Sequence, residues 1–341
     1  MTGSRGVIES PGFIDLQING AAGHDLTNNP ESVWRVGAAL PRYGVTAFLP
    51  TLVSPSYEIV DRACAAWLAG PPKGYVGAAP LGWHVEGPFI APTRHGAHDP
   101  ASLRAPDLDA ATSWSRAAGV AIVTLAPELP GALELIRALT ARGVVVSIGH
   151  TEATSEEAAA AFDAGARFVT HLFNATQKPA SASAPDLAAM PGIARAAIAD
   201  ERVTIGMIPD GLHVDPRLVG FVRNAVAPER FAVVTDAIAA LGMPPGRYRL
   251  AALDCIVDET SARLPTGGLA GSVLSMNQAI RNLAAFAGID QATALLAATA
   301  APAHLLGLDP AASGDLVELD ANLTPVRTII GGRVAFEARR A

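Results

Sequence analysis

The chain has 341 residues, of which 50% are hydrophobic and 17% are charged, and its formal net charge is −7. This length can bury one large core, and the composition is that of a globular protein and not of a disordered one. Because the net charge is negative, the chain offers no basic field for nucleic acid or for an anionic membrane, and we expect neither as a partner.

The two cysteines, Cys64 and Cys255, lie far apart in the sequence. We expect both to be reduced thiols in the core, as is typical of a cytoplasmic enzyme. The N-terminus shows no basic segment followed by an apolar run, and no apolar run reaches the length of a membrane span. These features predict a soluble, cytoplasmic protein.

Continuous apolar runs alternate with helical patterns over the first two thirds of the chain, which is typical of parallel strands covered on both faces. Strands are predicted at residues 13–18, 45–53, 79–86, 120–125, 144–148, 167–171, 203–208 and 231–235. Helices are predicted at residues 30–43, 55–69, 131–142 and 155–164. A further helix is predicted after a long polar loop at 91–100, and it ends near residue 119. Eight such units predict a (β/α)8 barrel. A doubly wound sheet is the alternative, but no glycine-rich dinucleotide turn follows the first strand.

The last third of the chain has a different pattern. A β-rich segment is predicted at residues 244–268, helices at 272–287 and 290–300, and strands at 316–319 and 326–330. We therefore expect an α/β protein with a barrel over residues 11–310. Residues 1–10 and 311–341 are expected to form a small β module.

Four ionisable residues stand at the ends of apolar runs, namely Glu86, His150, His171 and Asp236. In a barrel of parallel strands, the active site lies at the C-terminal ends of the strands. Desolvating a lone carboxylate costs several kcal/mol, so Glu86 at the end of a buried strand needs a partner for its charge. The pattern predicts a metal site with an acid/base beside it.

Seven short segments carry a resemblance to a known family. They are Pro-Gly-Phe-Ile-Asp at 11–15, His-Val-Glu-Gly-Pro at 84–88, Ser-Ile-Gly-His-Thr at 147–151, His-Leu-Phe-Asn-Ala at 171–175, Asp-Gly-Leu-His at 210–213, Thr-Asp-Ala at 235–237 and Leu-Ala-Gly-Ser at 269–272. In these segments, and in their order, the chain resembles the N-acetylglucosamine-6-phosphate deacetylases of the amidohydrolase superfamily. The resemblance implies a metal-dependent TIM-like barrel that hydrolyses N-acetylglucosamine 6-phosphate to glucosamine 6-phosphate and acetate.

The resemblance also implies roles for individual residues. Glu86, His150 and His171 would hold a divalent metal ion, Asp236 would be the catalytic acid/base, and His98 would polarise the amide carbonyl. The implied substrate contacts are Ala97, His98, Asn174, Ala175, His213, Leu269, Ala270 and Gly271. A bound ion lowers the pKa of water towards ~7, and Asp236 would pass the proton of that water to the leaving amine. We expect zinc, although the ligands also suit iron, cobalt, manganese and nickel.

Gln17 and Asn19 bear on the number of metal ions. Many amidohydrolases carry a His-x-His at the end of the first strand and hold a second ion there. This chain has Gln17 and Asn19 instead, and neutral amides bind divalent transition ions poorly compared with imidazole. We therefore expect one metal ion per chain.

The chain departs from the family pattern at the phosphate. Ala189 stands where the family carries an arginine that helps to bind the sugar phosphate. Losing a bidentate arginine contact would cost on the order of 2–4 kcal/mol, unless Lys178 or Arg195 replaces it. Lys178 could equally be a solvated loop residue. The deacetylation reaction is therefore better supported than the preference for a 6-phosphorylated substrate. The alternative substrate is a non-phosphorylated or different N-acetyl sugar.

A second departure concerns the terminal β module. Only ten residues precede Pro11, whereas the family has several tens that form half of a β-sandwich. We therefore expect an incomplete sandwich with a truncated N-terminal half, and tail strands that expose their edges. The resemblance also implies a homodimer.

Other readings of these residues stay open. A related amidohydrolase acting on another amide or a cyclic amide is one, and a non-catalytic sugar-binding member of the family is another. For His84, a hydrogen-bonded packing role is favoured over metal ligation, and His98 could be a solvated loop residue. Three further histidines are expected to be structural or exposed, namely His24, His95 and His304.

Overall fold

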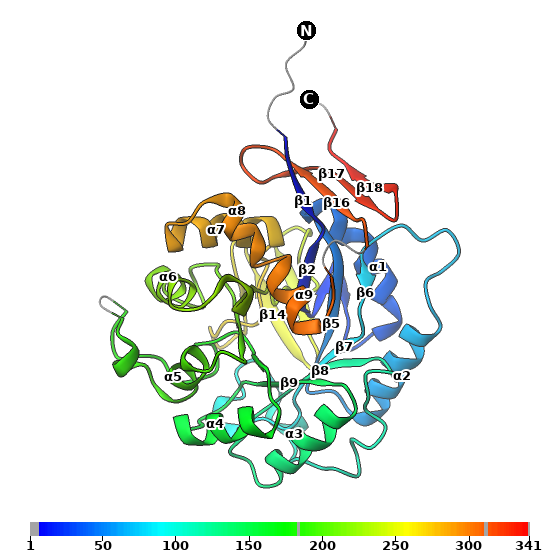
Figure 1. The fold of residues 1–341 in the computed structure, drawn as a ribbon. Helices are drawn as coiled ribbons and strands as arrows, with labels where there is room; N and C mark the ends of the chain where they lie inside the picture. Colours follow the sequence, from blue (N-terminus) through cyan, green and yellow to red (C-terminus); the bar gives the residue numbers. More distant parts are fainter. Residues whose placement is uncertain (1–6, 183–184, 310–312, 340–341) are drawn as a thin grey trace.

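The computed structural model describes residues 7–182, 185–309 and 313–339. Its centre is a parallel sheet of nine strands (Figure 1). Eight of them follow the order β12-β11-β10-β9-β8-β7-β5-β2, and the short strand β6 (Ala79–Pro80) pairs with β5. A parallel bridge between Ile18 and Ala237 brings the two ends of this sheet together, so the predicted barrel is confirmed. The eight strands in this order are β2 (Phe13–Ile18), β5 (Val45–Val53), β7 (Trp83–Glu86), β8 (Val120–Leu125), β9 (Val145–Ile148), β10 (Phe168–Val169), β11 (Thr204–Met207) and β12 (Phe231–Val233).

Helices surround the barrel on its outer side (Figure 1). They are α1 (Val33–Ala39), α2 (Tyr57–Leu68), α3 (Ala132–Ala141), α4 (Ser155–Ala164), α5 (Gly192–Ala199), α6 (Pro216–Ala225), α7 (Met276–Ala287), α8 (Gln291–Leu296) and α9 (Ala300–Leu306). The helix predicted at 290–300 is in fact α8, which ends at Leu296, followed by the separate helix α9. Within the described ranges, no helix has the length and apolar character that crossing a membrane requires.

The prediction of a helix between residue 100 and Gly119 is wrong. A short 3-10 turn at Pro100–Ser102 is followed by irregular turns. The Asp107 carboxylate accepts hydrogen bonds from the backbone N–H groups of Asp109 and Ala110, and such local side-chain bonds compete with helix formation. The connection from β7 to β8 is therefore a long loop, and this loop carries His98.

A four-stranded antiparallel sheet lies beside the barrel, where the two ends of the chain come together (Figure 1). Its order is β1 (Ile8–Pro11), β16 (Leu316–Leu319), β17 (Pro325–Ile330) and β18 (Arg333–Glu337). The expectation that the tail strands expose their edges is wrong for β16 and β17, since β1 pairs with β16 and β18 pairs with β17. We propose that this sheet is the small β module; residues 1–6, 310–312 and 340–341 lie outside the described residues.

The β-rich segment after the eighth barrel strand is confirmed as a small antiparallel sheet. It consists of β13 (Gly246–Leu250), β14 (Leu253–Val257) and β15 (Ala262–Arg263). Its buried residues Leu250 and Cys255 pack with Val53, the last residue of β5, and with Ile238, which follows β12. The small sheet therefore packs at the C-terminal end of the barrel.

Inside the barrel, a chain of buried hydrogen bonds connects residues on, or directly after, β2, β7, β8, β9 and β10. His84 Nε2 lies 2.7 Å from Thr124 Oγ1, Thr124 Oγ1 lies 2.7 Å from Thr170 Oγ1, and Thr170 Oγ1 lies 2.5 Å from Ser147 Oγ. His84 Nδ1 donates to the carbonyl oxygen of Leu16 at 3.1 Å. Both ring nitrogens of His84 are thus occupied, which confirms the packing role predicted for this residue.

The burial of His84 predicts a pH dependence of stability. Burial lowers the pKa of His84 from 6.5 to about 4, although the charge of Glu86 opposes this. Between these values the unfolded chain binds more protons than the folded one, so the free energy of unfolding falls as the pH falls. For this residue alone we expect a loss of roughly 2 kcal/mol between pH 7.5 and pH 5. Urea unfolding of the wild type and of His84→Gln at both pH values measures the difference, and equal losses would contradict it.

Candidate active site and metal centre

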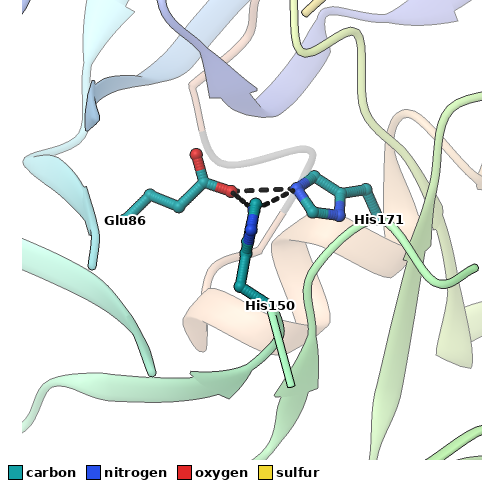
Figure 2. A group of neighbouring side chains, drawn as sticks. All are labelled: Glu86, His150 and His171. Atoms are coloured by element: carbon teal, nitrogen blue, oxygen red, sulfur yellow. Dashed lines mark hydrogen bonds and ion pairs between the residues drawn. The ribbon is translucent and has the colours of Figure 1, made fainter. Parts of the chain in front are cut away.

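Three buried side chains converge at the C-terminal ends of β7, β9 and β10 (Figure 2). Glu86 ends β7, His150 follows β9, and His171 follows β10. Glu86 Oε1 lies 3.2 Å from His150 Nε2 and 2.9 Å from His171 Nε2, and the two nitrogens are 3.3 Å apart. Within residues 7–182, 185–309 and 313–339, this is the one such group that could hold a metal ion.

The geometry of these atoms fits a divalent ion. Ligand atoms about 2.0–2.2 Å from a tetrahedral ion lie about 3.3 Å from one another, close to the spacing found here. His150 Nδ1 donates to the carbonyl oxygen of Arg94 at 2.9 Å, so the Nε2 of this ring presents its lone pair to the site. One carboxylate and two imidazoles leave coordination positions open, as a catalytic centre requires.

The charges of the three side chains also favour a cation. Burial by itself would raise the pKa of Glu86, but the contacts with His150 and His171 outweigh burial and hold this pKa well below its ordinary value. Burial would lower the pKa of His171, and the contact with Glu86 outweighs it and raises this pKa. Glu86 is therefore an ionised carboxylate that needs positive charge beside it.

Two amide side chains, one on the first barrel strand and one directly after it, donate to the carboxylates of the site. Gln17 Nε2 donates to Glu86 Oε1 at 3.0 Å and to Asp236 Oδ1 at 3.2 Å. Asn19 Nδ2 donates to Asp236 Oδ1 at 2.7 Å. Both amides thus turn their nitrogens towards carboxylates and act as hydrogen-bond donors. This arrangement supports the proposal of a single metal ion.

Asp236 follows β12 and stands beside the candidate metal centre. Burial, together with the charge of Glu86, raises the pKa of Asp236 to about 6. A carboxyl group with a pKa close to neutrality is suited to both accepting and donating a proton. Asp236, His150 and His171 have positive φ values of 51°, 51° and 28°. Such backbone strain in non-glycine residues is concentrated at functional sites.

These side chains line one pocket at the C-terminal end of the barrel. The residues predicted for the site that line this pocket are Glu86, Ala97, His98, His150, His171, Asn174, Asp236, Leu269 and Gly271. The structure thus brings most of the predicted residues to one cavity.

The comparisons with known proteins agree with this architecture. A sequence model of the Amidohydrolase family matches residues 8–334. The chain belongs to the amidohydrolase family. The N-acetylglucosamine-6-phosphate deacetylase of Bos taurus is 38% identical, over 98% of this chain and 85% of that protein. The N-acetylgalactosamine-6-phosphate deacetylase of Escherichia coli is 34% identical, over 95% of this chain and 87% of that protein.

A solved structure gives the same result for the fold. The crystal structure of N-acetylglucosamine-6-phosphate deacetylase from Thermotoga maritima superposes on this amidohydrolase with a TM-score of 0.87. The two chains are 31% identical, and the match covers 97% of this chain and 90% of that one.

Three predicted residues of this amidohydrolase lie outside the pocket lining. Ala270 is fully buried and packs in the apolar cluster with Ile238 and Leu250. The Ala175 carbonyl oxygen accepts a hydrogen bond from the backbone N–H of Thr151. His213 is buried, and its Nδ1 lies 2.6 Å from Asp210 Oδ2.

Three residues bear on the predicted contact with a sugar phosphate, namely Ala189, Arg195 and Lys178. Ala189 is exposed at the end of a 3-10 turn, Leu187–Ala189. Arg195 lies on α5, where its Nε donates to Ser155 Oγ at 3.2 Å, so it faces α4 and not the pocket. Lys178 Nζ donates to the carbonyl oxygen of His213 at 3.1 Å. Of the two cations considered, Lys178 is the one held next to a predicted site residue.

Sequence reasoning missed several residues of the pocket wall. Asn19, Val53, Gly96 and Leu250 line the pocket without having been predicted as substrate contacts. Asn19 carried a signal, because it is a polar residue just beyond a strand. Val53 and Leu250 carried none, since apolar residues that line a pocket look like residues of the core.

Proposed function

We propose that this amidohydrolase removes the acetyl group from N-acetylglucosamine 6-phosphate and releases glucosamine 6-phosphate and acetate. The observation that carries the proposal is the convergence of Glu86, His150 and His171 beside Asp236 in one buried pocket. The relatives named for this reaction support the choice of substrate.

We propose one zinc ion per chain, held by Glu86, His150 and His171. An ion in this position supplies polarisation of the substrate carbonyl and activation of a water molecule. The support is the spacing of the three ligand atoms and the lone pair that His150 Nε2 presents to the site. Iron, cobalt, manganese or nickel would suit the same ligands.

Asp236 carries the proton transfers, and the other side chains donate hydrogen bonds. Asp236 accepts the proton of the attacking water and later donates it to the leaving amine. Gln17 and Asn19 both donate to Asp236 Oδ1, so the Oδ2 atom is left for the proton. His98 donates a hydrogen bond to the carbonyl oxygen as negative charge develops on it. Burial lowers the pKa of His98 to about 4, so its ring is neutral near pH 7.

The preference for a 6-phosphate is the more specific part of the proposal. We propose that Lys178 supplies the positive charge that is lost where Ala189 replaces the arginine of the family. The support is that the ammonium group of Lys178 is held at the carbonyl oxygen of His213. Lysine contributes a point charge and not a bidentate fork, so the contact should be weaker than that of an arginine.

Steady-state acetate release from N-acetylglucosamine and N-acetylgalactosamine, each with and without a 6-phosphate, tests this part. We expect Lys178→Gln to lower kcat/KM about tenfold for the phosphorylated sugars and to leave the free sugars unaffected. The control is Lys73→Gln, which removes the other, exposed lysine. If the wild type showed no preference for phosphorylated sugars, the proposed 6-phosphate preference would be wrong. The alternative would then hold, namely deacetylation of a free N-acetyl sugar, which the absence of an arginine at Ala189 favours.

We also propose that the protein is a cytoplasmic homodimer. The resemblance to the deacetylases supports the dimer, and the two unpaired cysteines, Cys64 and Cys255, support the reducing compartment. Light scattering that gave a monomer at high protein concentration would contradict the dimer.

A further inference from the structure

Ser54 joins the end of β5 to the loop that carries His98. It follows Val53, and its Oγ lies 2.7 Å from His98 Nδ1. Both side chains are buried, with 7% and 3% of their surface exposed. The backbone N–H of Ser54 donates to the carbonyl oxygen of Glu86 at 2.8 Å. The serine is therefore fixed against the same strand that supplies the proposed metal ligand.

The surrounding backbone is shaped so that this contact can form. Ser54 has a φ of +37°, in the left-handed region that non-glycine residues rarely adopt. A Cβ at Gly87 would lie 2.6 Å from Ser54 Oγ, and Gly87 itself has a φ of +77°. A larger residue at position 87 would displace the serine hydroxyl. Strain of this kind persists where the surrounding structure holds it in place.

The surroundings of His98 select one of its two neutral forms. A neutral imidazole carries a proton on one ring nitrogen and a lone pair on the other. His98 Nε2 lies 3.7 Å from Glu86 Oε2, and an ionised carboxylate only accepts hydrogen bonds. A lone pair on Nε2 would face the lone pairs of this oxygen, whereas an N–H is attracted to it. The proton therefore belongs on Nε2, and Nδ1 presents its lone pair to Ser54.

We propose that the Ser54 hydroxyl donates to His98 Nδ1 and so holds His98 in the form whose Nε2–H faces the substrate carbonyl. The proposal rests on the proposed deacetylation for its functional meaning. Ser54 would then be a positioning residue that acts through His98. Without the hydroxyl, Nδ1 would lose its buried donor, and the ring would be free to carry its proton on Nδ1 or to rotate.

Kinetics of two variants that lack the hydroxyl test the proposal. Ser54→Ala and Ser54→Gly both remove it, and glycine also relieves the positive φ, so a shared defect belongs to the hydroxyl. We expect kcat for acetate release to fall by about 10- to 100-fold in both, with KM changed less than about twofold. Ser54→Thr keeps the hydroxyl and should recover most of kcat. The control is Ser56→Ala, which removes the N-cap of α2 and should leave kcat unchanged.

A spectroscopic measurement on the unmodified zinc-loaded protein decides the same point without activity. Long-range ¹H–¹⁵N correlation spectra distinguish a protonated ring nitrogen from one with a lone pair, and loss of the signals in His98→Gln assigns them. We expect the lone-pair signal at Nδ1. A lone-pair signal at Nε2, or an unchanged kcat in Ser54→Ala, would overturn the proposal. Failure of the deacetylation itself would instead appear as a wild type that releases no acetate.

Discussion

Asp236→Asn is expected to lower kcat for acetate release by about 10³-fold and to leave the metal content unchanged. The asparagine oxygen can still accept the hydrogen bonds that Gln17 and Asn19 donate to Oδ1, so the pocket should keep its shape. The amide has no basic oxygen to take a proton from water. The measurement combines steady-state kinetics with elemental analysis of the purified variant.

The control for this change is Asp163→Asn, since Asp163 is on the outer surface with 73% of its side chain exposed. A variant at position 236 that kept more than a tenth of the wild-type kcat would contradict the acid/base role. If the wild type bound the amino sugar but released no acetate, the non-catalytic reading of the chain would hold instead.

Glu86→Gln is expected to abolish both metal binding and activity. The amide is a poor ligand for a divalent transition ion, and it removes the negative charge at the centre of the site. Removing a residue that only orients a metal ligand lowers the metal affinity about 10- to 100-fold. Removing a ligand itself should therefore lower the metal affinity by more than that. Elemental analysis after dialysis against metal-free buffer should find less than about a tenth of the wild-type zinc.

The matched control is Glu156→Gln, an exposed residue near the start of α4. If Glu86→Gln retained as much zinc as the wild type, Glu86 would not be a metal ligand. Together the two substitutions separate the proposed roles, because Asp236→Asn should lose activity with the metal bound and Glu86→Gln should lose both.

The barrel and its polar strand ends could be predicted from the sequence because the signals are local. Continuous apolar runs mark parallel strands, and a charged residue at the end of such a run is placed by the fold at the same rim as its counterparts. Glu86, His150, His171 and Asp236 were found in this way, and the structure brings them together.

The missed features depend on contacts between distant segments. The loop after β7 looked helical, but turns such as the one capped by Asp107 replace the helix. Leu250 reaches the pocket only because the small sheet of β13 packs over the barrel end. Ser54 is an ordinary serine in the sequence, and its contact with His98 arises from two loops that meet only in the fold.

The most direct test of the account is a metal titration of the stripped protein. Zinc is added in graded amounts to metal-free chain, and acetate release from N-acetylglucosamine 6-phosphate is followed at each step. Activity should rise in proportion to zinc and level off at one equivalent per chain. Acetate release without any metal, or activity that appears only as a second equivalent binds, would contradict it.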